Sequence, residues 1–131
     1  MSHMKLLIID DESECRAILA ELLWMLDGSA GSIDEIREAG NLEEALDALS
    51  GCDAVICDGN FPARENSKDH WLAVLAKCMK QHARFLLHTG DDEIARRAEH
   101  MGLKVFRKPT HAEEIYRALT SGAGVLGKHA A

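Results

Sequence analysis

The sequence contains little proline and no long apolar run. Only 2 of its 131 residues are proline. No run approaches the roughly 20 apolar residues that a membrane-spanning helix needs, and the N-terminus lacks the apolar region of a signal peptide. These absences, with 47% hydrophobic and 28% charged residues, exclude a fibrous or disordered chain. We expect a globular protein located in the cytoplasm, without a membrane partner.

Paired cysteines and an excess of positive charge are also missing. The cysteines show no CxxC spacing, and two of them lie in apolar stretches, where free cysteine behaves as a small buried hydrophobe; they are Cys15, Cys52, Cys57 and Cys78. We therefore favour a structural role for them over metal binding. The formal net charge of −7 disfavours attraction to the phosphates of nucleic acid, so we expect no direct nucleic-acid partner.

The length of the chain fits one domain. Residues 1–3 resemble a cloning scar, which would place the native start at Met4 and leave His3 without a function. Residues 123–131 form a short segment that follows Gly122, and we expect them to be a flexible tail. The predicted domain therefore covers residues 4–122.

Short apolar runs alternate with segments of helical periodicity. The runs at residues 4–9, 53–57, 84–88 and 103–106 are typical of strands that are buried on both faces. Residues 33–39, which are more polar, are the candidate for the second strand. The helical segments cover residues 12–27, 41–49, 67–80, 91–100 and 111–119. Five strands that alternate with five helices predict a parallel α/β sheet with helices on both faces.

Three of the predicted helices carry specific local signals. In the first helix, apolar residues recur at three-and-four spacing: Ile18, Leu19, Leu22, Leu23 and Leu26. Asn41 is placed to cap the second helix, with Glu44 completing a capping-box-like turn. In the third helix one face holds Trp71, Leu72, Leu75 and Met79, and we interpret Trp71 as a core residue rather than a binding residue.

Reactive side chains follow four of the five predicted strands. Asp10 and Asp11 follow the first strand, Asp58 follows the third, and Thr89 and Lys108 end the fourth and fifth. Ligands in parallel sheets bind beyond the carboxyl ends of the strands, so these residues should converge. Three carboxylates in one cleft repel one another unless a cation is present. A hard divalent ion is the natural choice.

Magnesium prefers oxygen ligands and takes only one or two carboxylates. Asp11 and Asp58 suit it as ligands, Asp10 could hold a metal-bound water, and the backbone carbonyl of Asn60 could add a neutral ligand. Beside such a metal site, Asp58 could act as a nucleophile towards phosphorus, while Lys108 and Thr89 each contact one phosphoryl oxygen.

Each of these residues has an ordinary interpretation on its own. Asp10 and Asp11 could cap a helix, Asp58 could be a turn residue, and Lys108 could be a surface lysine. Their joint occurrence, in this order and each after a buried strand, favours a functional site.

These residues resemble the receiver domain of bacterial two-component response regulators, over about residues 4–119. The matching pieces are Asp10-Asp11, the segment from Asp58 to Pro62, Thr89-Gly90 and Lys108-Pro109. The resemblance implies the flavodoxin-like (βα)5 fold with strand order 2-1-3-4-5. It also implies a Mg²⁺-dependent switch in phosphorelay signal transduction, with Asp58 as phosphoacceptor and Thr89 moving to contact the phosphoryl group.

The same resemblance implies the partners. A sensor histidine kinase or a histidine phosphotransfer protein would supply the phosphoryl group, and a downstream output domain or protein would receive the signal. The phosphorylated chain could also form a homodimer. The chain would not be an enzyme, although it would assist its own phosphorylation and dephosphorylation.

The sequence departs from the family pattern at two places. The aromatic residue expected three positions before the lysine is replaced by Val105, and Phe106 should point to the opposite face of the strand. The loop of residues 63–69 is polar and lacks the glycine commonly found there. Output and partner specificity could therefore differ from the usual pattern.

Two alternatives stay open. The chain could be a pseudo-receiver that binds a partner without being phosphorylated. It could also be an aspartate-nucleophile phosphatase of the haloacid-dehalogenase kind, although the nucleophile there normally follows the first strand in an Asp-x-Asp arrangement, whereas here that strand ends in Asp10-Asp11-Glu12.

Overall fold

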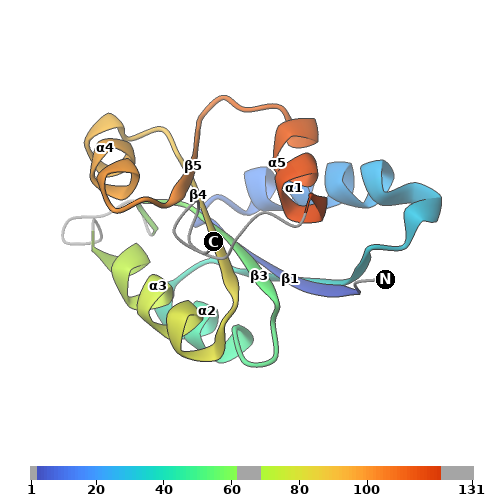
Figure 1. Cartoon of the computed structure of the whole chain (residues 1–131), viewed down its shortest axis with the longest axis horizontal. Coiled ribbons are helices and arrows are strands. Elements are labelled where there is room, and N and C mark those ends of the chain that lie inside the picture. The colour runs from blue at the N-terminus through green and yellow to red at the C-terminus, as the bar shows by residue number, and fades with distance from the viewer. Residues whose placement is uncertain (1–2, 62–68, 122–131) are drawn as a thin grey trace.

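The computed structural model describes residues 3–61 and 69–121, and it contains one parallel sheet of five strands in the order β2-β1-β3-β4-β5 (Figure 1). The strands are β1 (Met4–Ile9), β2 (Ile33–Ala39), β3 (Ala54–Cys57), β4 (Arg84–Thr89) and β5 (Lys104–Arg107). The predicted flavodoxin-like fold and strand order are confirmed. The predictions for residues 1–2, Pro62, most of the 63–69 loop and the tail lie outside the described residues.

Five α-helices connect and follow the strands. They are α1 (Ser13–Asp27), α2 (Leu42–Ala48), α3 (His70–Gln81), α4 (Asp92–His100) and α5 (Ala112–Thr120), with a short 3-10 turn η1 (Gly28–Ala30) after α1. Figure 1 shows α1 and α5 on one side of the sheet and α2 and α3 on the other. No helix in the described ranges is both long and apolar enough to span a bilayer.

Alternating side chains of the central strands form two cores, one on each face of the sheet. Ile8 and Ile56 join the core under α1 and α5, whereas Ile9 and Cys57, which follow them, join the core under α2, α3 and α4. Because both faces are covered, β3 is buried along its whole length. This is why the strands appear in the sequence as continuous apolar runs.

The three-and-four spacing of apolar residues in α1 does not mark the buried face of that helix. Leu23 is buried, but Ile18 is 58% exposed, and Leu22 and Leu26 are also exposed. The buried positions are instead Ala20, Leu23 and Asp27, which are themselves three and four residues apart. The helix that this spacing predicts is present, and its inward positions hold a small residue and a hydrogen-bonded acid as well as Leu23.

Other local predictions hold in the structure. Trp71 is fully buried, as expected for a core residue, although Met79 of the same predicted face is exposed. The Asn41 side chain accepts a hydrogen bond from the Glu44 N–H at 2.9 Å, and the Glu44 carboxylate accepts one from the Gly40 N–H, so the cap of α2 is confirmed.

The strand β5 separates its neighbouring apolar residues as expected. Val105 packs, partly buried, against the core under α2, α3 and α4, and Phe106 belongs to the core under α1 and α5. The two residues therefore point to opposite faces of the sheet. Position 105, where the receiver-domain pattern has an aromatic residue, therefore holds the smaller side chain of valine.

Asp27 is a buried acid that joins three elements. Its carboxylate accepts hydrogen bonds from the Ser32 and Ile33 N–H groups at 3.0 and 3.1 Å and from the Tyr116 hydroxyl at 2.7 Å. The acid therefore holds the end of α1 to the start of β2 and to α5. The hydrogen bond to Asp27 raises the pKa of Tyr116, because a phenolate beside the carboxylate is disfavoured.

Replacing Asp27 by alanine should lower the free energy of unfolding by about 2–4 kcal/mol, because two buried N–H groups lose their acceptor. Tyr116→Phe removes only one of the bonds and should cost about 1 kcal/mol. Urea denaturation followed by circular dichroism measures both. Glu21→Ala, an exposed change on the same helix, is the control and should stay within about 0.5 kcal/mol; an equally small effect of Asp27→Ala would contradict this role.

Candidate phosphoryl and metal site

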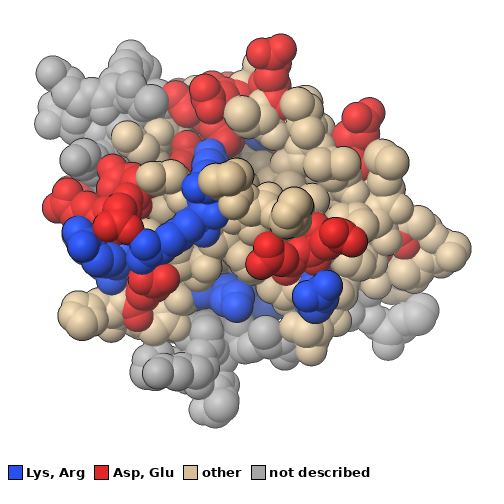
Figure 2. Space-filling view, turned by 90° about the horizontal axis from the view of Figure 1, so that it is seen from above, with Lys and Arg blue, Asp and Glu red and all other residues tan. Residues whose placement is uncertain are grey.

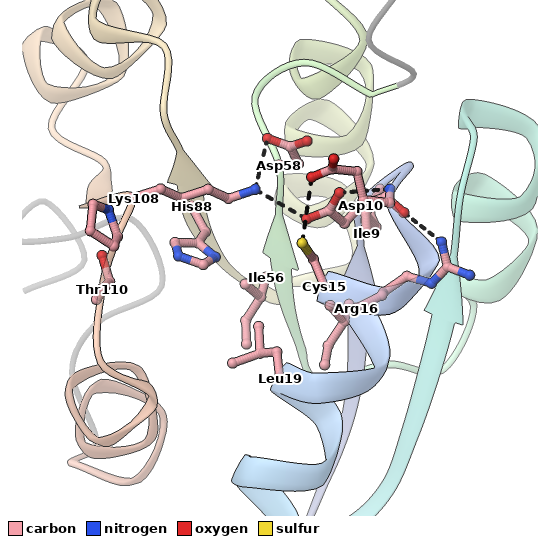
Figure 3. Close-up of a pocket in the computed structure, with 13 residues that line it drawn as sticks. Ile9, Asp10, Cys15, Arg16, Leu19, Ile56, Asp58, His88, Lys108 and Thr110 are labelled. Carbon is pink, nitrogen blue, oxygen red and sulfur yellow. Dashed lines mark hydrogen bonds and ion pairs between the residues drawn. The ribbon is translucent and has the colours of Figure 1, made fainter.

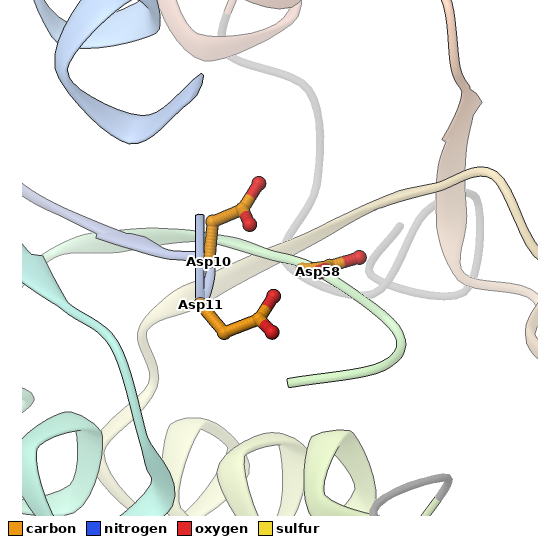
Figure 4. A group of neighbouring side chains, drawn as sticks. All are labelled: Asp10, Asp11 and Asp58. Carbon is orange, nitrogen blue, oxygen red and sulfur yellow. The ribbon is translucent and has the colours of Figure 1, made fainter. Parts of the chain in front are cut away.

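Backbone hydrogen bonds bring the acids of β1 and β3 together. The Asp10 N–H donates to the Ala39 carbonyl at 3.0 Å, and the Asp58 N–H donates to the Ile9 carbonyl at 2.9 Å. Each acid thus continues the pairing of its strand by one residue. Asp10, Asp11 and Asp58 each offer a carboxylate oxygen, and these three oxygens lie within 4.8 Å of one another (Figure 4). The predicted convergence of the three carboxylates is found.

Lys108 reaches this cluster from the end of β5. Its Nζ lies 3.1 Å from Asp10 Oδ2 and 3.7 Å from Asp58 Oδ1. The Lys108 N–H also donates to the Thr89 carbonyl at 2.9 Å, which fixes the lysine backbone against the end of β4. Figure 3 shows the ammonium between the two acids. A single cation therefore bridges the acids of two strands.

Thr89 is buried beside the residue that follows Asp58. A Cβ added to Gly59 would lie 2.8 Å from Thr89 Oγ1 and 2.9 Å from Ile94, closer than real side chains approach. The Thr89 hydroxyl also accepts a hydrogen bond from the Asp91 N–H at 3.0 Å. Glycine at position 59 is thus the residue that lets the backbone after Asp58 lie against the threonine.

Burial raises the pKa of Asp58 to about 6, from an ordinary value of 3.8. Lys108 and a backbone hydrogen bond from Asn60 oppose this rise, while Asp10 and Asp11 add to it. Burial alone would lower the pKa of Lys108, but the facing carboxylates outweigh it and raise that pKa. Near neutral pH the surroundings therefore disfavour the ionised form of Asp58 and favour the charged form of Lys108.

The donor set suits a hard divalent ion. Three carboxylates supply oxygen ligands of the kind that Mg²⁺ prefers. The Asp10 carboxylate already accepts from the Glu12 N–H at 2.9 Å and from Lys108, which fits an indirect role through water better than direct ligation. Thiols do not compete, because burial raises the pKa of Cys57 well above its usual value. Asn60 enters through its backbone hydrogen bond to Asp58, and its role as a carbonyl ligand stays a prediction.

Three neighbours of the site were not anticipated from the sequence. The Arg16 guanidinium donates to the Asp10 carbonyl at 2.5 Å and to the Glu38 carboxylate at 3.1 Å. Cys15 donates to the Glu12 carboxylate. His88, which precedes Thr89, has its pKa lowered to about 4 by burial and by Lys108. Among these three, only the contact of Arg16 with Asp10 has a signal in the sequence, because Arg16 lies near the start of the helix that follows the acid pair.

A cavity of about 460 Å³ opens beside these residues. It runs from Asp10, Asp58 and Lys108 down to the sheet, between α1 and the segment that follows β5 (Figure 3). The polar cluster therefore occupies only one end of a larger hollow.

Charged groups over α4, α5 and α1 are intermixed rather than sorted by sign. On the face in Figure 2, basic side chains lie beside acidic ones. Arg107 pairs with Asp92 and with Glu99 at 2.8 Å, and Arg96 pairs with Asp92 at 3.4 Å. A narrow band of basic side chains crosses one side of that face, and acidic side chains flank it.

Several solved structures have a fold similar to that of this chain. A chain in the crystal structure of the P1 domain of CheA3 in complex with CheY6 from R. sphaeroides is 21% identical, with a TM-score of 0.69, covering 92% of this chain and 97% of its own. The receiver domain of the putative response regulator NarL from Mycobacterium tuberculosis is 20% identical, with a TM-score of 0.69 and coverages of 92% and 96%. A de novo designed Rossmann 2x3 protein is 19% identical, with a TM-score of 0.61 and coverages of 95% and 96%.

No protein-family model and no curated protein sequence matches the chain. The likeness to solved structures, at identities of about one fifth, is therefore a likeness of fold. Its α/β element order and its parallel five-stranded sheet belong to that fold. The chain has the fold of response-regulator receiver domains.

Proposed function

We propose that the chain, over residues 4–122, is a response-regulator receiver domain that accepts a phosphoryl group on Asp58 with Mg²⁺. The observation that supports this most is the position of Lys108 Nζ, 3.1 Å from Asp10 and 3.7 Å from Asp58, beside three carboxylates within 4.8 Å of one another. Acids and an ammonium from three strand ends thus lie together, which supports aspartyl phosphorylation at this position.

The side chains have separate roles in this proposal. The Asp58 carboxylate is the nucleophile: one oxygen forms a bond to phosphorus while the bond from phosphorus to the donor breaks. Lys108 stabilises negative charge on a phosphoryl oxygen, and the Thr89 hydroxyl, beside Gly59, is placed to hydrogen-bond another. Asp11 and Asp58 would hold Mg²⁺, with Asp10 and the Asn60 carbonyl completing the site. When bound, Mg²⁺ supplies charge neutralisation between the acids and the phosphoryl oxygens.

A sensor histidine kinase or a histidine phosphotransfer protein would donate the phosphoryl group, in the cytoplasm. A downstream output domain or protein, or a second phosphorylated copy, would then recognise the altered surface. The phosphoryl group adds about −1.5 to −2 charges, which strengthens the attraction for Lys108 and Thr89. The chain would be a switch rather than an enzyme. Val105 lacks the ring of the usual aromatic lever, so side chains of β5 would transmit the change differently.

The two alternatives are weaker. A pseudo-receiver has no need of the full set of acids, lysine and threonine, and here the structure brings the acids and the lysine together. A phosphatase of the haloacid-dehalogenase kind would place its nucleophile after β1, where Asp10 instead accepts hydrogen bonds from Glu12 and Lys108.

Incubation of the wild-type chain with acetyl phosphate and Mg²⁺ should produce a labile adduct. Intact mass spectrometry should detect it as a mass increase of about 80 Da over the unmodified chain. Asp58→Asn should abolish the adduct, because an amide cannot act as the nucleophile. Asp47→Asn, an exposed change on α2, is the matched control and should label normally. Undiminished labelling of Asp58→Asn would refute the assignment, and steady hydrolysis of a phosphomonoester would favour the phosphatase.

The raised pKa of Asp58 predicts a pH-dependent stability in EDTA. Because the folded state holds this proton up to about pH 6 and the unfolded state only to about 3.8, the contribution of Asp58 to the free energy of unfolding falls as pH rises through that window. Asp58→Asn should therefore be more stable than the wild type at pH 7, by on the order of 1–3 kcal/mol, with the difference vanishing near pH 4.

Urea denaturation at several pH values measures this difference. Added Mg²⁺ should stabilise the wild type at pH 7, by binding the ionised acids, and have little effect on Asp58→Asn. A stability difference that does not change between pH 4 and pH 7 would contradict the burial of an ionisable group at this position.

A further inference from the structure

We propose that the cavity between α1 and the segment after β5 binds an uncharged aromatic molecule that carries one hydroxyl group. The cavity measures about 460 Å³, within the range of about 300–1,000 Å³ that is usual for small-molecule sites. The phosphoryl chemistry uses only the end that holds Asp10, Asp58 and Lys108. The inference concerns the remainder, and it does not depend on phosphorylation of Asp58.

The deeper part of the cavity is apolar. Its floor is the sheet itself, where Ile8 and Ile56 lie almost completely buried on neighbouring strands. Leu19 lines it from α1, and Pro109 lines it from the segment after β5. Figure 3 shows Leu19 and Ile56 close together at the bottom of this hollow. Walls of this kind favour a flat apolar body over a polar one.

One polar group among these walls has no partner. His88 lines the cavity, and its Nε2 atom is buried and makes no hydrogen bond with any residue that the structure describes. Figure 3 shows the imidazole between the Lys108 side chain and Ile56. The nitrogen is closed off from solvent, so the imidazole must turn towards the cavity for a ligand to pair with it, and that pairing removes the penalty of an unpaired buried nitrogen. A hydroxyl can both donate and accept, so it pairs with either tautomer of the ring.

The charges around the cavity exclude ionic ligands. Asp10, Asp58 and Glu12 line its mouth and would repel an anion. Both cations that line the cavity already have acidic partners: Lys108 lies 3.1 Å from Asp10, and Arg16 lies 3.1 Å from Glu38. A cationic group in the deeper part would lose its hydration against Ile8 and Ile56 without gaining a counter-charge. An uncharged ligand with one hydroxyl satisfies all of these conditions.

The test uses the full chain and two probes that differ by one hydroxyl group, 4-ethylphenol and ethylbenzene. Titrations followed by amide chemical shifts should give saturable changes around His88, Ile56 and Leu19 for both probes. The affinity for 4-ethylphenol should be about five- to tenfold greater, as expected for one added hydrogen bond. His88→Leu should bind both probes and remove the difference between them.

Two variants of α1 locate the site. Cys15→Phe should fill the cavity and abolish binding of both probes, because Cys15 lines it. Met25→Phe is the matched control, because Met25 lies on the same helix but lines a separate groove with Leu22 and His111. Well-dispersed spectra of each variant establish that it is folded.

The proposal is overturned by any of three results: shift changes that do not saturate, shift changes centred on Leu22 and His111, or wild-type binding by Cys15→Phe. Equal affinities of the two probes for the wild type would overturn the role of His88. Because none of these measurements involves phosphorylation, they leave the labelling of Asp58 unaffected.

Discussion

The mutual repulsion of acids at the ends of two central strands is the constraint on which the site depends. Asp10 and Asp58 cannot move apart, because their backbone N–H groups are part of the hydrogen bonding between β1, β2 and β3. The sheet therefore forces like charges together in a place where burial already disfavours them. Lys108 offsets part of this unfavourable free energy. The pKa of Asp58 still lies above its ordinary value, first because of burial and then because of the neighbouring acids. An electrostatically incomplete site of this kind fits both parts of the proposed function, the binding of Mg²⁺ and the attack of Asp58 on phosphorus.

The residues around the acids hold this arrangement in place. Gly59 lets the backbone after Asp58 approach Thr89, and the Thr89 carbonyl in turn holds the Lys108 backbone. Arg16 binds the carbonyl of Asp10 and the side chain of Glu38, so it connects α1 to the edge strand β2 at the same end of the sheet. Geometry in the cluster is thus set by backbone contacts more than by side-chain rotamers.

Most of the fold could be predicted because the local signals agree with one another. Buried parallel strands appear as apolar runs, and acids, threonine and lysine after those runs define the site. The sequence pattern alone did not show which residues of α1 face the core. Ile18 is exposed, whereas Ala20 and Asp27 face inward, and Asp27 accepts three hydrogen bonds there. The cavity beside His88 could not be foreseen either, since an empty volume depends on how α1 packs beside the segment after β5, which is far from it in the chain.

The bond between Asp27 and Tyr116 has a mechanical consequence. It fastens the end of α1 remote from Asp10 to the middle of α5, at 2.7 Å, whereas Cys15, near the other end of α1, lines the hollow beside the acids. Loss of this bond would therefore loosen the packing of α1 against α5 through a residue pair that touches neither the acids nor anything bound between them.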